Sequence, residues 1–63
     1  MRYRLRSIRR AKDITQEELS RLSGVSRATI ASIESGENRV VLSSTLLKLA
    51  TALECRVEDL FFS

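Results

Sequence analysis

The side chains best suited to molecular recognition lie in the middle of the chain. Arg27 carries a planar guanidinium that can donate two parallel hydrogen bonds, as to O6 and N7 of guanine. Ala28 is small enough to pack against a thymine methyl group, and Ser32, one helical turn further on, can hydrogen-bond a base or a phosphate. One long donor among short side chains suits close approach to the base edges of DNA.

Two further side chains of this region suit phosphate. Gln16 is the expected first residue of a helix, where the backbone amides point outward and the helix dipole is positive. Its side-chain amide can donate to the same phosphate, although an ordinary exposed residue is the alternative. Thr29 lies at the side of the surface formed by Arg27, Ala28 and Ser32, so any contact that it makes is with phosphate rather than a base.

Catalytic and metal-binding chemistry has little support. The sequence has no histidine and one cysteine, Cys55, which excludes a Ser-His-Asp triad, a Cys-His pair, a zinc site and an internal disulfide within one chain. The acidic pairs at 17–18 and 58–59 fall at expected helix starts, where carboxylates stabilise the positive end of the dipole. We therefore expect no enzymatic activity, no metal site and no cofactor.

The basic charge is concentrated near the N-terminus. The formal net charge is +3, and residues 1–12 contain six basic residues and no acid. Arginine, the prevailing basic residue, suits phosphate, although a soluble basic helix would have the same composition. No run approaches the ~20 apolar residues of a membrane span, and the N-terminus is charged rather than apolar. We expect a cytoplasmic location and no membrane partner.

The elements that must position these residues are helices. Apolar residues recur at intervals of three and four, which predicts a single all-α domain over residues 1–63. Five helices are expected, at about residues 2–12, after Thr15, at about 27–35, after a cap at Ser43 or Ser44, and at about 57–62. The residues expected to face inward are Leu5, Ile8, Ala11, Leu19, Leu22, Val25, Ile30, Ile33, Leu46, Leu49, Ala50, Leu53, Val57, Leu60 and Phe61.

The second and third helices meet at a well-marked junction. Thr15 and Glu18 match a capping box, Gly24 suits the left-handed end of a helix, and Ser26 suits the N-cap of the next. Two short helices joined in this way form a helix-turn-helix, whose second helix can enter the DNA major groove. A small bundle with an inert outer helix is the alternative.

The chain resembles the phage-repressor and Cro-like helix-turn-helix family, often called XRE-like, from about Leu5 to Phe61. The resemblance rests on the segments TQEEL at 15–19, SGVSRATI at 23–30, IESG at 33–36, TLLKLATAL at 45–53 and VEDLF at 57–61. It implies a five-helix, lambda-repressor-like DNA-binding domain. Val41, Ser43 and Arg56 depart from the family's usual proline, apolar residue and capping Ser or Thr, but none lies on the expected reading face.

The resemblance also implies roles for individual residues. The family's base-reading positions are occupied by Arg27, Ala28 and Ser32. Its backbone-contacting positions are occupied by Gln16, Ser35 and Arg39, the last with a minor groove within reach. Arg9 and Glu34 match a recurrent ion pair that joins the first helix to the third, with two unpaired surface charges as the alternative.

We expect the chain to bind a double-stranded DNA operator as a homodimer and to act as a repressor-type transcriptional regulator. The two reading helices would enter successive major grooves ~34 Å apart. Candidate dimer contacts are Cys55, Arg56 and Phe62, together with residues 40–42. Apart from Phe62, the alternative for each of them is a place at the edge of the core.

Two wider alternatives stay open. The chain is either a stand-alone regulator, such as a Cro-like protein, a restriction–modification controller or an antitoxin, or a fragment of a longer one, and the initial Met favours the first. The rival class is a protein-interaction module that keeps the fold without the DNA role. No small-molecule site is evident.

Overall fold

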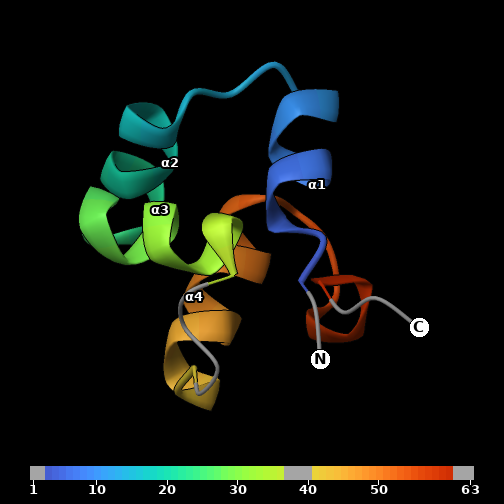
Figure 1. Ribbon diagram of the computed structural model, residues 1–63. Coiled ribbons are helices and arrows are strands. Elements are labelled where there is room, and N and C mark those ends of the chain that lie inside the picture. The colour runs from blue at the N-terminus through green and yellow to red at the C-terminus, as the bar shows by residue number, and fades with distance from the viewer. Residues whose placement is uncertain (1–2, 37–40, 61–63) are drawn as a thin grey trace.

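The computed structural model describes residues 3–36 and 41–60 (Figure 1). Its elements are α1 (Leu5–Ala11), α2 (Gln16–Ser23), α3 (Arg27–Ser35), α4 (Ser43–Ala52) and the 3-10 helix η1 (Val57–Leu60). The expected all-α fold is confirmed. The expected fifth helix is a single 3-10 turn in the described residues, so four α-helices and this turn replace the predicted set of five.

The caps of α2 explain where it begins and ends. The Thr15 hydroxyl accepts a hydrogen bond from the Glu18 amide at 3.0 Å, as predicted, and lies 3.3 Å from the Glu18 carboxylate. Gly24 follows the last turn with φ +75°, and its N–H donates to the Ser20 carbonyl at 2.9 Å. Glycine adopts this left-handed backbone conformation without steric cost because it has no Cβ. Local chemistry therefore sets both ends of α2.

The start of α3 also follows the prediction. The Ser26 hydroxyl accepts from the Thr29 amide at 3.2 Å, and Gly36 closes the helix at φ +82°.

Two other helix starts differ from the prediction. The N-cap of α4 is Leu42, which gives no side-chain hydrogen bond, and Ser43 is already helical. The predicted serine cap is wrong because the helix begins one residue earlier. Helix α1 begins at Leu5 rather than near residue 2, because the Arg4 N–H donates to the Leu60 carbonyl at 2.7 Å and ties the preceding chain to η1.

The core is built from all the helices. The buried apolar side chains, at most 7% exposed, are Leu5, Leu19, Val25, Ile30, Ile33, Leu46, Leu49, Ala50, Leu53 and Leu60, all of them predicted to face inward. Ala11 and Leu22 were expected to do the same and are exposed, Leu22 by 59%. Leu22 lies in the last turn of α2, where it lines a surface depression with Leu47 of α4 instead of reaching the core.

The packing leaves α3 at the outside of the molecule. Helix α2 packs on both α3 and α4, α1 packs on α3, and η1 packs on α4 (Figure 1). Ile30 and Ile33 turn the inner side of α3 toward this core. Of the predicted reading residues, Ala28 and Ser32 lie on the side of α3 opposite Ile30, and Arg27 lies at the flank of that side.

Candidate nucleic-acid interface

The outer face of α3 carries the predicted base-reading residues. Arg27 and Ala28 are exposed, whereas Ser32 is half-buried. Ile30 is fully buried on the side of the helix opposite Ala28 and Ser32. The described part of the chain therefore leaves Arg27 and Ala28 open to a ligand, and their contact with bases stays a prediction.

The hydroxyls beside this face differ in what they can still donate. Ser26 Oγ donates to Thr29 Oγ1 at 2.8 Å, so the hydroxyl hydrogen of Thr29 is free to point toward an incoming phosphate. Ser35 Oγ donates to the Ser32 carbonyl at 3.1 Å and must rotate before it can donate elsewhere. Thr29 is thus the better prepared phosphate donor of the two. Arg39, the other predicted backbone contact, lies outside the described residues.

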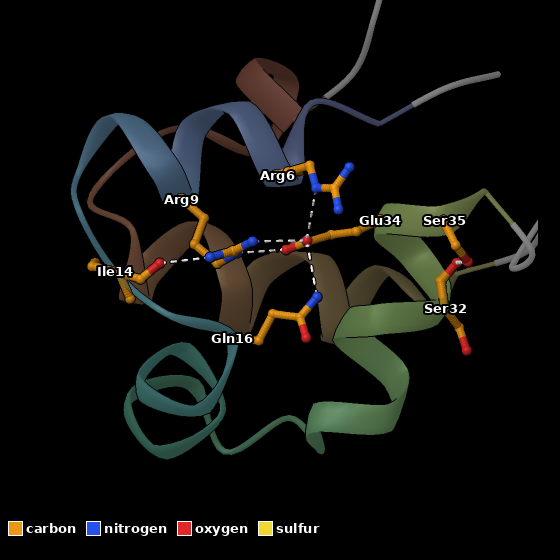
Figure 2. Close-up of polar contacts among 7 residues, drawn as sticks. All are labelled: Arg6, Arg9, Ile14, Gln16, Ser32, Glu34 and Ser35. Carbon is orange, nitrogen blue, oxygen red and sulfur yellow. Dashed lines mark hydrogen bonds and ion pairs between the residues drawn. The ribbon is translucent and has the colours of Figure 1, made fainter.

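Arg9 and Glu34 join α1 to α3. Arg9 Nε donates to Glu34 Oε2 at 2.7 Å and Nη2 donates to Oε1 at 3.0 Å, which is a two-pronged contact (Figure 2). Arg9 Nη1 also donates to the Ile14 carbonyl at 2.7 Å. The side chains are only 11% and 2% exposed. The pair therefore joins α1, α3 and the segment that contains Ile14, at a place largely shielded from solvent.

Two more side chains approach the same carboxylate. Gln16 Nε2 donates to Glu34 Oε1 at 3.1 Å, and Arg6 Nε lies 3.7 Å from that oxygen (Figure 2). Sequence reasoning chose Gln16 for phosphate but found neither its bond to Glu34 nor any role for Arg6. The spacing of Arg6, three residues before Arg9 on one helix, was the available signal.

The cluster is charged at neutral pH. Burial raises the pKa of Glu34, but hydrogen bonds from Arg9 and Gln16 and the charges of Arg9 and Arg6 outweigh it, so this pKa lies below its ordinary value. Hydrogen bonding to Glu34 raises the pKa of Arg9. One carboxylate therefore faces two guanidinium groups.

Two of the predicted dimer contacts, Cys55 and Arg56, directly precede η1. Cys55 is half-buried and packs against the core, and burial together with the Asp59 charge raises the pKa of its thiol. The Arg56 side chain is 77% exposed and lies 3.8 Å from Asp59, whose carboxylate also accepts from the Arg56 amide at 3.0 Å. Phe62 lies outside the described residues.

Residues 41 and 42 differ in exposure. Val41 packs against the core, whereas Leu42 is 70% exposed. Residue 40 is not described.

Neither a metal site nor a membrane span is found in the described segments. Residues 3–36 and 41–60 contain no cluster of three or more His, Cys, Asp or Glu side chains placed to hold a metal ion. None of the helices there is both long enough and apolar enough to cross a bilayer.

Helix α3 packs on α2, follows it across the left-handed Gly24 and leaves one side exposed. This arrangement is that of a helix-turn-helix DNA-binding domain. The chain belongs to the family of Cro/C1-type HTH DNA-binding domains, which it matches over residues 4–61. This family is one of DNA-binding transcriptional regulators and is not enzymatic.

Known proteins with similar sequences include regulators of two kinds. The chain is 45% identical to the restriction-modification controller protein C.AhdI from Aeromonas hydrophila, covering 92% of this chain and 86% of that one, with a TM-score of 0.83. It is 43% identical over 56 residues to control protein C.SmaI of Serratia marcescens, covering 89% of this chain and 66% of that protein.

The second kind is a longer regulator. The chain is 40% identical over 58 residues to the HTH-type transcriptional repressor RghR of Bacillus subtilis (strain 168), covering 92% of this chain. It spans 43% of the length of that repressor.

Proposed function

We propose that this chain binds a specific double-stranded DNA operator as a homodimer, with α3 in the major groove, and acts in the cytoplasm as a repressor or controller of transcription. The observation that carries the proposal is the two-sided character of α3. On the inner side of α3, Ile30 and Ile33 are buried in the core and at most 2% exposed, while Arg27 and Ala28 are exposed to solvent. The similarity to C.AhdI, C.SmaI and RghR supports a regulatory role of this kind.

The reading face offers complementary contacts. Arg27, in the first turn of α3, would donate to guanine, Ala28 would pack on a thymine methyl, and Ser32 would reach a base one turn further on. The residues proposed to fix the DNA backbone are Gln16, Thr29, Ser35 and Arg39. Backbone contacts would supply most of the affinity and base contacts most of the sequence preference.

The size of the domain supports a dimer. Its Cα dimensions are 25 × 20 × 19 Å. Two successive major grooves on one face of the duplex are ~34 Å apart. One copy therefore covers one groove, and a second copy is needed to read a two-fold operator. The proposed contacts between copies are Cys55, Arg56 and Phe62.

The test begins with selection of bound duplexes from a random pool. We expect two inverted half-sites about one helical turn apart, and binding that weakens with salt. Arg27→Ala should then cost ~1–3 kcal/mol on the selected operator and relax the preference at one base pair of each half-site. Arg21→Ala, which removes the same charge from the last turn of α2, is the matched control.

Two outcomes would overturn parts of this proposal. If Arg27→Ala and Gln16→Ala bind the operator as well as the parent does, the assigned site is wrong. If the protein shows no salt-dependent binding to any duplex at low micromolar concentration, the protein-interaction alternative replaces the DNA role.

A further inference from the structure

One oxygen of the Glu34 carboxylate lies between two nitrogen donors, one from Arg6 and one from Gln16. Glu34 Oε1 accepts from Gln16 Nε2 at 3.1 Å, and Arg6 Nε is 3.7 Å from the same atom. Figure 2 shows Arg6 and Gln16 approaching this oxygen from opposite sides, one from α1 and one from the start of α2. The two donor nitrogens therefore lie within about 7 Å of each other, although ten positions separate the residues in the sequence.

The charges at this point do not balance. Arg9 binds Glu34 with two hydrogen bonds, through Nε and Nη2, and its third nitrogen, Nη1, donates to the Ile14 carbonyl. That bidentate contact already matches the single negative charge of the carboxylate. Arg6 is therefore a surplus cation, and the four-residue cluster of Arg6, Arg9, Gln16 and Glu34 has a net charge of +1.

The two arginines also differ in access. The Arg9 side chain is 11% exposed, whereas the Arg6 side chain is 65% exposed. Arg6 meets the carboxylate through Nε at an ion-pair distance, so its two terminal Nη groups have donors to offer to a second anion. Gln16 has one amide hydrogen on Glu34 and a second one to donate.

We propose that Arg6 and Gln16 together bind one phosphate of the DNA backbone in each half-site, with Glu34 as the positioning residue that holds both donors before DNA arrives. This inference rests on the proposed function and adds Arg6 to it. The buried carboxylate holds the Gln16 amide by a hydrogen bond and attracts the Arg6 guanidinium, so less side-chain freedom is lost when the phosphate binds. Because Arg9 neutralises Glu34, the carboxylate does not repel the phosphate.

The experiment replaces single operator phosphates with uncharged methylphosphonates, one position at a time, and measures the dissociation constant. The parent should lose on the order of tenfold in affinity at one position in each half-site. Arg6→Gln and Gln16→Ala should each lose sensitivity at that same position and keep it at the others. Arg6→Gln should also flatten the plot of log K against log salt by about 0.9 for each half-site.

Two variants serve as controls. Arg21→Gln removes an arginine from the far end of α2 and should leave the methylphosphonate profile unchanged. Arg6→Lys keeps the charge but loses the planar fork, so it should keep the salt slope and bind more weakly. Thermal unfolding of each variant checks that the fold is retained.

The outcomes separate this inference from the proposed function. If Arg6→Gln has the parent's salt slope and the parent's methylphosphonate profile, Arg6 does not bind phosphate, while operator binding by α3 still stands. If Arg6→Gln and Gln16→Ala lose sensitivity at different positions, they do not share a phosphate. A parent protein that binds no duplex overturns both proposals.

Discussion

Replacing Arg9 by methionine tests how strongly the ion pair stabilises the fold. The variant keeps an aliphatic stem but removes both hydrogen bonds to Glu34, whose side chain is 2% exposed, and the bond to the Ile14 carbonyl. Breaking one side of a buried pair typically costs ~3–5 kcal/mol. Because Gln16 and Arg6 still face the carboxylate, we expect the lower end, about 3 kcal/mol.

That loss is large for a chain of this size. At ~0.05–0.15 kcal/mol per residue, the whole free energy of unfolding is on the order of 3–9 kcal/mol. We therefore expect the melting temperature of Arg9→Met to fall by roughly 12–24 °C, measured by circular dichroism. The protein concentration must be equal in all samples, since dimer formation adds to the apparent stability.

The chain contains a matched control. Arg56 also pairs with an acid, Asp59, but at 3.8 Å and with side chains 77% and 43% exposed. An exposed pair contributes ~0–1 kcal/mol, so at a protein concentration low enough to keep the protein monomeric, Arg56→Met should change the free energy of unfolding little. If Arg9→Met costs no more than Arg56→Met, the reasoning from burial is refuted.

The effect of pH supplies a second readout. The pKa of Glu34 is lower in the folded protein than in the unfolded chain, so its stabilisation is fully present above the unfolded value of ~4.3 and is lost as pH falls through the folded value. Without Arg9, burial of the carboxylate raises this pKa, and protonation then relieves the cost. The destabilisation caused by Arg9→Met should thus be largest at neutral pH and shrink toward pH 4. A cost independent of pH would contradict an unpaired carboxylate as its cause.

Three further predictions concern the helix-turn-helix and are checked by urea unfolding at fixed protein concentration. Leu19→Ala should cost about 2–5 kcal/mol because Leu19 is fully buried, whereas Leu22→Ala, at a side chain 59% exposed, should cost less than about 1 kcal/mol; equal losses would contradict the packing. Gly24→Ala should cost about 1 kcal/mol from its φ of +75° alone, since an added Cβ meets no atom within 4 Å; a neutral result would show that the turn relaxes. Thr15→Ala removes the hydroxyl that accepts from the Glu18 amide and should cost about 1 kcal/mol. Thr15→Ser keeps a hydroxyl there and should retain most of that stability.

The local elements could be predicted because their causes lie within a few residues. The hydroxyls of Thr15 and Ser26 each cap an amide three positions on, and Gly24 takes the left-handed conformation directly after its helix. The interval of Ile30 and Ile33 identifies the buried side of α3. These facts were sufficient to predict a helix-turn-helix and the face that it presents.

Other features depend on where separate helices cross, which no local rule encodes. Leu19 and Leu22 both fit the apolar interval, but Leu19 is fully buried in the core, whereas Leu22 only lines a surface depression beside α4 and is 59% exposed.

The Glu34 cluster has the same origin. Its bonds to Gln16 and Arg9 join residues 18 and 25 positions apart, and Arg6 is added from α1. By itself the sequence determined the four α-helices, the caps of α2 and α3 and the outward face of α3, because those follow from neighbouring residues. Only the tertiary structure decided which charges share one buried carboxylate, because that requires three helices to meet.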